Sequence, residues 1–295
     1  MSFRNILDLV ILSAVWGASF LFMRVATPEF GAIALMELRV SIALAFLLPF
    51  FVARSGLAEL RVHWKPICFV GVFTTAIPFC LLAWATLSLT AGSVSIVNAT
   101  TPIFGALVAW LWLDEKLATR QVVGLLLGFA GVVVLLGDRV GETGSAALTG
   151  AFTALGASTL YGLGANFTRR YLDGVSAVTV STGSMISATV LLLPGALLTW
   201  PQGPVSPEAW LSVLIMGVAS TGIAYLLFFR LLKSVGPARA LTVTYLVPLF
   251  AILWGGMFLA EPVTAGMLAG GTITLLGTSL ATGLPLRRSL RAAAD

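Results

Sequence analysis

Two prolines inside long apolar runs are the residues of this sequence with the clearest chemical consequence. Pro102 and Pro248 lack a backbone N–H, so in a helix each frees the carbonyl four residues earlier. Those carbonyls belong to Asn98 and Thr244, whose polar side chains share a helical face with the prolines. We predict that Asn98 and Thr244 bind a small polar ligand and that Pro102 and Pro248 are gating hinges. The alternative is that the prolines only bend helices for packing and that Asn98 bonds a neighbouring helix.

Four aromatic residues occupy the middles of apolar runs, although Trp and Tyr normally collect at the ends of membrane spans. They form two pairs related by an internal repeat, Trp16 with Tyr161 and Phe79 with Tyr225. A buried indole N–H or phenol needs a polar partner, which a water-filled or ligand-filled cavity provides. We predict that these rings line a binding site for an apolar or aromatic side chain. Packing in the core is the alternative for each ring.

Glu37 and Arg39 lie deep within an apolar run, where charges are costly and commonly functional. Being two positions apart on a helix, they point to different faces and cannot pair with each other. We predict that Arg39, like Asn98, donates to a bound carboxylate, and that Glu37 is a possible proton carrier. A structural role beside a buried partner is the alternative for each. Four other charges lie close enough to the ends of runs to reach water: Asp8, Arg24, Arg169 and Arg230.

Several chemistries have no support in the sequence. Cys68 and Cys80 are too far apart on one helix for a disulfide and His63 is the only histidine, so we expect no metal site. A Ser/His/Asp set, a P-loop and a dinucleotide fingerprint are missing, so we expect neither catalytic residues nor a cofactor. An enzyme acting on lipid-linked substrates would need an Asp/His/Lys cluster at one membrane face, which the sequence lacks. The chain is therefore not expected to be an enzyme.

The apolar runs themselves define the fold class. Apolar residues make up 58% of the chain and charged residues 10%, which is too few charges for a normal water-facing surface. Each run has about 20 residues, the length that crosses a membrane as a helix. We predict an all-α polytopic membrane protein with ten transmembrane helices, at residues 6–26, 30–53, 66–88, 91–113, 120–137, 149–169, 175–199, 208–232, 237–259 and 264–284.

The second half of the chain repeats the first. Residues 71–137 share about 15 identities with the residues 146 positions later, where composition alone gives roughly six. They include Gly71 with Gly217 and Glu115 with Glu261. Because five spans is an odd number, the second copy starts on the opposite side of the membrane, as in inverted-repeat secondary transporters. We predict a first five-helix repeat, a linker, a second repeat around a shared central cavity and a basic cytoplasmic tail, at residues 1–138, 139–148, 149–284 and 285–295.

Basic residues favour one orientation in the membrane. With both termini in the cytoplasm, 14 of the 17 Lys and Arg residues fall at cytoplasmic ends of spans. Arg24 and Arg139 fall outside this set, and Arg39 lies within a span. The pI of 9.7 therefore reflects membrane topology rather than nucleic-acid binding. The first run is too long for a signal peptide and a second span follows directly, so we expect no cleavage.

Three sequence motifs resemble those of a known family. They are the run Ser13–Phe20, the run from Pro102 to Trp112-Leu113-Asp114-Glu115 and the spacing Gly124…Gly131, with the last two repeated as Pro248…Glu261 and Gly270…Gly277. In these features the chain resembles the EamA-type ten-span members of the drug/metabolite transporter superfamily, and among them bacterial exporters of amino acids, aromatic ones in particular. Tyr161-Gly162 departs from the Trp-Gly that the family often has there. The resemblance implies spans one to four and six to nine around the cavity, spans five and ten at the periphery, and a bacterial inner membrane.

We predict a secondary transporter that exports small neutral or zwitterionic metabolites by alternating access. Amino acids with aromatic or hydrophobic side chains are the first candidates. One alternative is a proton-coupled multidrug exporter in which Glu37 carries the proton; the intramembrane enzyme on lipid-linked substrates is the weaker alternative. Expected partners are the small-molecule substrate and the lipid bilayer, without nucleic acid. The oligomeric state is left open, and a monomer is compatible with the sequence.

Overall fold

The structure is a computed structural model that describes residues 2–53 and 56–282, without the side chains of 138–143 and 237–238. Every regular element in these ranges is a helix. In chain order they are α1 (Phe3–Ala53), α2 (Gly56–Val70), η1 (Gly71–Ala76), α3 (Ile77–Ala85), α4 (Ala91–Asn98), α5 (Thr101–Leu113), α6 (Thr119–Thr143), α7 (Ser145–Tyr171), α8 (Ala177–Leu198), α9 (Pro207–Ile215), η2 (Met216–Ile223), α10 (Ala224–Val235), α11 (Pro237–Ala240), α12 (Val243–Leu259) and α13 (Ala265–Thr282).

The helix labelled α1 covers two membrane spans. If it were straight, its 51 residues would extend about 75 Å, more than twice the thickness of a hydrocarbon core. The helix instead breaks at Gly31, where φ is 73° and ψ is 162°, a conformation that glycine adopts without strain. Residues 3–30 and 32–53 are therefore two helices, and they contain the first and second spans.

Several other spans are built from consecutive helical pieces. Residues 56–85, 91–113 and 207–235 each read through as one apolar span, and α12 is a shorter apolar helix. With α1 counted twice, the described residues contain ten spans. The prediction of an all-α protein with ten membrane helices is confirmed.

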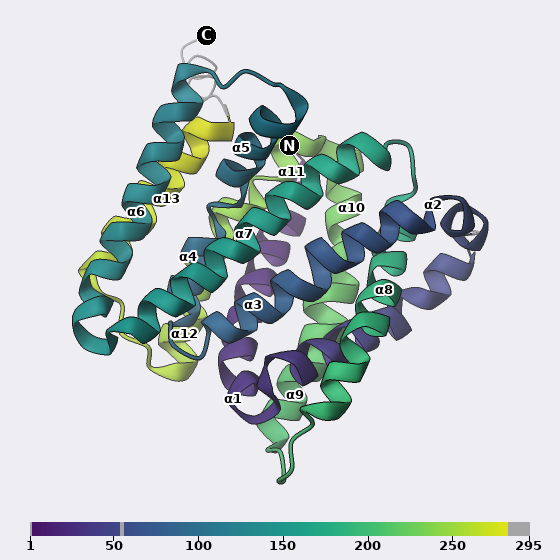
Figure 1. The fold of residues 1–295 in the computed structure, drawn as a ribbon, viewed down its shortest axis with the longest axis horizontal. Helices are drawn as coiled ribbons and strands as arrows, with labels where there is room; N and C mark the ends of the chain where they lie inside the picture. The colour runs from purple at the N-terminus through teal and green to yellow at the C-terminus, as the bar shows by residue number, and fades with distance from the viewer. Residues whose placement is uncertain (1, 54–55, 283–295) are drawn as a thin grey trace.

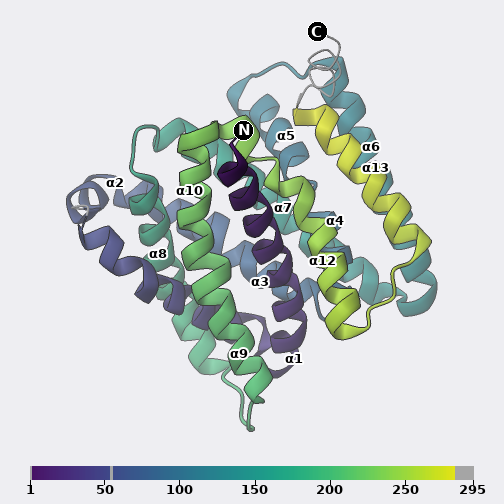
Figure 2. The same ribbon diagram turned by 180° about the vertical axis from the view of Figure 1, so that it is seen from behind.

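The fifth and tenth spans pack together at one edge of the molecule. Figures 1 and 2 show α6 and α13 side by side there, in the peripheral position that the family resemblance implied. Their backbones approach closely: a Cβ on Gly277 would collide with the backbone nitrogen of Gly128, and a Cβ on Gly131 with Thr274. Glycine at these positions therefore permits the contact and leaves the other spans to surround the cavity.

Two π-helical segments occupy equivalent positions in the two repeats. η1 interrupts the third span and η2 the eighth, and Gly71 at the start of η1 corresponds to Gly217 in η2. A π turn widens the helix by one residue and redirects the following side chains, and such turns are frequent at functional sites. The apolar pattern of the sequence predicts only continuous helices here, so both segments are new findings of the structure.

The segment 139–148, predicted as a linker, is largely helical. α6 extends to Thr143 and α7 begins at Ser145, with Gly144 at a φ of 59° between them. The basic tail predicted at 285–295 lies outside the described residues. The division of the chain at these particular boundaries stays a prediction.

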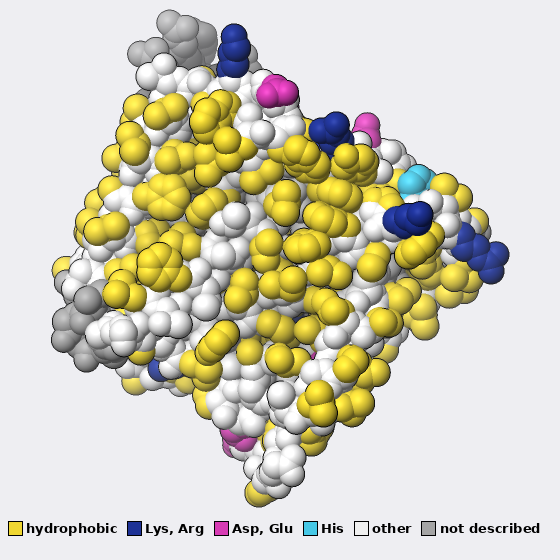
Figure 3. All heavy atoms as spheres, viewed as in Figure 1, with side chains coloured by type: hydrophobic (Ala, Val, Ile, Leu, Met, Phe, Trp, Pro, Cys, Tyr) yellow, Lys and Arg dark blue, Asp and Glu magenta, His cyan; other side chains and the backbone are white. Residues whose placement is uncertain are grey.

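The outer surface of the bundle is apolar, as contact with lipid requires. Figure 3 shows hydrophobic side chains over most of the visible flank, with most of the visible Lys and Arg side chains along the rim near the N-terminus and α2. Exposed apolar side chains include Leu126, Phe152 and Leu197. We call the side of the bundle that holds the N-terminus the N-terminal face and the other side the far face.

Candidate functional site

A cavity of about 580 Å³ lies between helices of the two repeats. This volume is typical of sites for small molecules. The cavity brings together every residue predicted to bind substrate: Trp16, Arg39, Phe79, Asn98, Tyr161, Tyr225 and Thr244. Pro102 lines it as well, whereas Pro248 and Glu37 are not among the lining residues.

Arg39 supplies the charge of this cavity. It is 6% exposed, and among the described lining residues it is the only charged side chain. Its Nε donates to Thr221 Oγ1 at 2.9 Å, and its guanidinium carbon lies 4.1 Å from the centre of the Phe79 ring, in cation–π geometry. Its two terminal nitrogens have no hydrogen-bond partner in the described part of the chain. The guanidinium is thus held by its contact with the Phe79 ring and by the hydrogen bond from Nε to Thr221. Its two terminal NH2 groups remain available to donate to a ligand.

Aromatic rings surround this cation. Tyr161 and Tyr225 lie close enough to Arg39 to interact with it electrostatically. Trp16 packs against Phe228 with 5.3 Å between ring centroids. The lining is therefore largely apolar, with one fixed cation, a combination that suits a ligand with one anionic group and an apolar body.

Hydroxyl groups supply acceptors on the cavity wall. Thr74 Oγ1 donates to the Val70 carbonyl at 2.6 Å, and Ser184 Oγ donates to the Val180 carbonyl at 2.7 Å. Because each hydroxyl proton is directed to its own helix, the oxygen lone pairs remain available to accept from a ligand. Such oxygens can receive an ammonium group without a buried carboxylate.

The surroundings of the two prolines differ from the expectation. Span four breaks at residues 99–100, and Pro102 lies in the first turn of α5 rather than inside a continuous helix. The Asn98 carbonyl accepts from Thr101 Oγ1 at 2.8 Å, so a ligand at this carbonyl would share the oxygen with Thr101, and binding there stays a prediction. The side-chain oxygen Oδ1 of Asn98, by contrast, is buried without a hydrogen-bond partner. Pro248 lies inside α12.

Glu37 does not line the cavity, and its hydrogen bond is to Ser41, a residue that lies next to α8. Its Oε1 accepts from Ser41 Oγ at 2.7 Å, and Ser41 Oγ lies 3.4 Å from Thr189 Oγ1. Its Oε2 is buried and has no hydrogen-bond partner among the described residues. The spacing argument that Glu37 and Arg39 face different neighbours agrees with these contacts.

Sequence reasoning missed the residue that orients Arg39. Thr221 lies in η2 and is fully buried, and its hydroxyl donates to the Met216 carbonyl, five residues earlier, at 3.0 Å. The oxygen is therefore oriented to accept from Arg39. A usable signal was present, because Thr75 and Thr221 are identical residues 146 positions apart, but threonine in an apolar helix is common.

The fold and the cavity together define the class of protein. Ten spans in two repeats, with a lined cavity between them, are the architecture of a membrane transport protein. A family model described as the EamA-like transporter family matches residues 5–137 and 148–283. The chain belongs to this family, as the resemblance in the sequence indicated, and it is a multi-pass membrane transporter rather than an enzyme.

Relatives of known sequence extend along nearly the whole chain. An uncharacterized transporter, YvbV, of Bacillus subtilis is 28% identical over 94% of this chain and 90% of its own length. A probable amino-acid metabolite efflux pump of Salmonella typhimurium is 25% identical over 96% of both chains. A probable terminal-alkyne amino-acid exporter of Streptantibioticus cattleyicolor is 24% identical over 92% of this chain and 91% of its own. A solved crystal structure at 22% identity, with a TM-score of 0.66 over 96% of this chain and 98% of that one, has the same fold.

Proposed function

We propose that this protein exports small zwitterionic metabolites, with amino acids that carry aromatic or hydrophobic side chains as its main substrates. The observation that carries the proposal is the open guanidinium of Arg39 inside an aromatic-walled cavity. Two relatives whose names state amino-acid export or efflux support it.

Each part of an amino acid has a counterpart in the cavity. The two open nitrogens of Arg39 can donate side by side to the α-carboxylate, the geometry at which a guanidinium excels. The α-ammonium can donate to hydroxyl oxygens and to Asn98 Oδ1, which lacks a partner. The side chain can lie among rings such as Trp16 and Phe228. A substrate with two negative charges would leave one of them without a cation.

The direction of export depends on how the protein is oriented in the membrane and on how the cavity opens to each side in turn. We propose that the N-terminal face is cytoplasmic, because the span order predicted from the sequence assigns 14 of the 17 basic residues to the same side as the N-terminus, and that the membrane is the bacterial inner membrane. The substrate would enter from the N-terminal face and leave at the far face as the repeats rock about the cavity. This is alternating access without a cofactor.

Counterflow in proteoliposomes tests the proposal. Vesicles preloaded with unlabelled phenylalanine should take up labelled phenylalanine and tryptophan. Phenylalanine amide, which keeps the ammonium and the ring but lacks the carboxylate, should compete at least about tenfold more weakly because Arg39 loses its partner. Equal competition by the amide, or no counterflow with any amino acid of a full panel, would refute the assignment.

Proton coupling through Glu37 is a second candidate, favoured by the buried Oε2 that has no partner. A carboxyl in this position is stabilised by a proton, since an uncompensated charge within the membrane is costly. In that case export should respond to a pH gradient, and the Glu37→Gln variant should transport without that response. Wild-type export that is indifferent to the gradient would leave Glu37 with a structural role.

A further inference from the structure

Two ion pairs occupy equivalent positions at opposite faces of the protein. Arg24 Nε lies 3.5 Å from Glu261 Oε1, and Arg169 Nη2 lies 2.6 Å from Glu115 Oε1. Each arginine stands near the end of the first span of its own repeat, 145 residues from the other. Each glutamate follows the fourth span of the other repeat, 146 residues from its counterpart. Both pairs therefore join the first span of one repeat to the fourth span of the other.

The helix ends that carry the two glutamates are built alike. The cap residues that follow α5 and α12 are Asp114 and Ala260, with left-handed φ values of 54° and 51°. In both, the backbone N–H of the glutamate donates six residues back, from Glu115 to Ala109 and from Glu261 to Gly255. The backbone therefore presents both carboxylates in the same way, and any difference between the pairs comes from what surrounds them.

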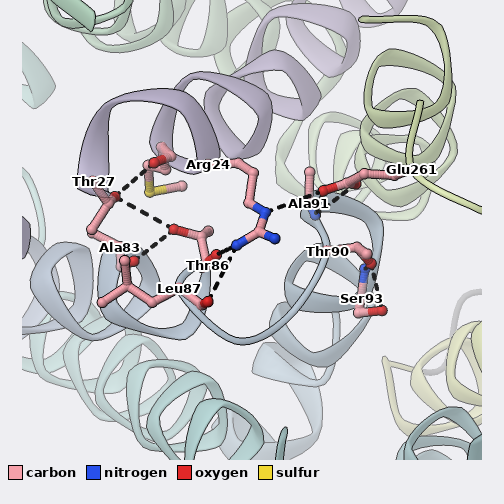
Figure 4. Close-up of polar contacts among 10 residues, drawn as sticks. Arg24, Thr27, Ala83, Thr86, Leu87, Thr90, Ala91, Ser93 and Glu261 are labelled. Atoms are coloured by element: carbon pink, nitrogen blue, oxygen red, sulfur yellow. Dashed lines mark hydrogen bonds and ion pairs between the residues drawn. The ribbon is translucent and has the colours of Figure 1, made fainter. Parts of the chain in front are cut away.

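At the far face the pair is tied to a third element, the connection between α3 and α4. Figure 4 shows Arg24 Nη1 donating to the carbonyls of Thr86 and Leu87, the latter at 3.3 Å. The Ala91 N–H at the start of α4 donates to both carboxylate oxygens of Glu261, at 3.2 and 3.0 Å. The Glu261 side chain is only 11% exposed. Three separate segments are thus locked together by charge-assisted hydrogen bonds.

At the N-terminal face the equivalent pair stands alone. The side chains of Arg169 and Glu115 are 57% and 54% exposed, and within the described residues they make no hydrogen bond to a third element. The position equivalent to Ala91 is Pro237, which has no N–H to donate to Glu115. Because residue 237 is proline, Glu115 cannot receive the backbone hydrogen bond that Glu261 receives from Ala91.

The cavity also differs between the far face and the N-terminal face. Along α7 its lining extends through Thr168 to Leu172, past Arg169 at the N-terminal face. Toward the far face its lining ends at Met23 on α1 and Leu82 on α3, before the Arg24 network is reached. Met23 is 1% exposed. The cavity lining thus stops short of the ion pair at the far face and extends past the ion pair at the N-terminal face.

We propose that Arg24, Glu261 and the α3–α4 connection form the gate at the far face, and that Arg169 and Glu115 are its counterpart at the N-terminal face. Opening the far face requires the α3–α4 connection to leave Arg24 and Glu261. The α10–α11 connection would then contact Arg169 and Glu115. Only its backbone carbonyls could bond there, by accepting from Arg169, because Pro237 has no N–H to donate to Glu115. The missing N–H at Pro237 makes the N-terminal gate the weaker of the two, so the resting protein is open to the N-terminal face. This inference rests on the proposed alternating-access cycle.

Cysteine labelling tests the gate without using transport. In a chain with Cys68 and Cys80 replaced by serine, Met23→Cys reports on the cavity just inside the far gate, and Val175→Cys reports on its N-terminal end. A membrane-impermeant maleimide is applied to vesicles whose orientation is fixed by protease cleavage of a tag at the N-terminus. Labelling of Met23→Cys from the far face should be slow in the parent chain and about tenfold faster with Arg24→Gln. The matched variant Arg169→Gln should not raise it.

Ala91→Pro is the most selective variant, because the hydrogen bond that it removes is the one from the Ala91 N–H to the Glu261 carboxylate. Proline is favoured at the first position of a helix, and Thr90 already has the extended conformation that a following proline prefers. It should raise far-face labelling of Met23→Cys about threefold, by making the far gate resemble the N-terminal one. If Arg24→Gln misfolded, labelling of both Met23→Cys and Val175→Cys would rise from both faces. In that case the result with Ala91→Pro tests the gate.

Two results would overturn the gate. One is far-face labelling of Met23→Cys at the parent rate in both Arg24→Gln and Ala91→Pro. The other is an equal rise with Arg169→Gln. Failure of the proposed substrate is separate: the expected labelling without counterflow of any amino acid would leave the gate standing and reject the amino-acid assignment.

Discussion

The second span of the first repeat and its counterpart, α8 in the second repeat, face the cavity with different chemistry. At the 145-residue offset Arg39 corresponds to Ser184, and both line the cavity. Glu37 corresponds to Thr182 at the same offset, and each has a buried oxygen without a partner. The two repeats thus contribute equivalent helices to the one cavity, but of these two helices only the one in the first repeat supplies charge. The two copies share the scaffold, and we expect substrate preference to depend on side chains that they do not share.

Removal of the cation should have the largest effect on this comparison. Arg39→Gln is expected to weaken binding of an amino acid by about 2–5 kcal/mol, or at least about thirtyfold, because the carboxylate is then buried without a charged partner. Ser184→Ala, the matched change in the second repeat, should cost less than about tenfold. Equilibrium binding of labelled tryptophan to the purified protein measures both. Similar losses in the two variants would show that the cation has no special role.

The aromatic pairs test whether the two repeats share the apolar part of the substrate. Trp16→Ala and Tyr225→Ala should each lower recognition of phenylalanine or tryptophan by about 1–3 kcal/mol, roughly tenfold to a hundredfold, and change alanine or threonine much less. Competition assays with these four amino acids would reveal the altered preference. If every amino acid loses by the same factor, the rings serve the fold or the gate instead.

Pro102 and Pro248 allow the backbones of the fourth spans of the two repeats to be compared. Pro102 follows the break at 99–100 and lines the cavity, whereas Pro248 lies inside α12 and does not. Pro102→Ala should extend the helix across the break, stiffen span four and abolish most transport at normal membrane expression. Pro248→Ala should reduce transport by a smaller factor. Wild-type flux in both variants would exclude gating bends at these positions.

The smallest expected effect lies outside the membrane, where the repeats also differ. Glu29 accepts from the backbone N–H and hydroxyl of Ser206 at 2.7 and 2.6 Å, and these bonds lower the pKa of Glu29 below its usual value. At the equivalent position the second repeat has Gly174, which has no side chain. A lowered pKa means that this stabilisation is complete at neutral pH and is lost as the pH falls through the pKa of the folded state. Ser206→Ala should therefore lower the melting temperature slightly, and by more at pH 7 than at acidic pH, measured by differential scanning fluorimetry. The part that persists at acidic pH is the lost cap of α9, because Ser206 Oγ also accepts from the Ala209 N–H.

Much of the architecture follows from the sequence alone, because lipid imposes simple rules. A helix that crosses a membrane must be about 20 apolar residues long, so run length and composition predict the ten spans. The second span ends at Ala53 and the fourth at Leu113, as their predicted ranges had them. The repeated glycines, such as Gly124 with Gly270, and the repeated helix-end glutamates reveal the duplication. The cavity residues were found because polar and aromatic side chains at mid-depth are unusual enough to stand out.

Other features depended on contacts between segments far apart in the sequence, and only the tertiary structure decided them. Hydropathy cannot distinguish a π turn from an α turn, so η1 and η2 and the role of Thr221 were not predicted. The carbonyl of Asn98, expected to be open, also accepts from Thr101, a local hydrogen bond that competes with any ligand. Arg24 and Glu261 are each consistent with a solvated helix end when considered alone. Their joint contact with the α3–α4 connection becomes visible only when segments more than 60 residues apart meet in space.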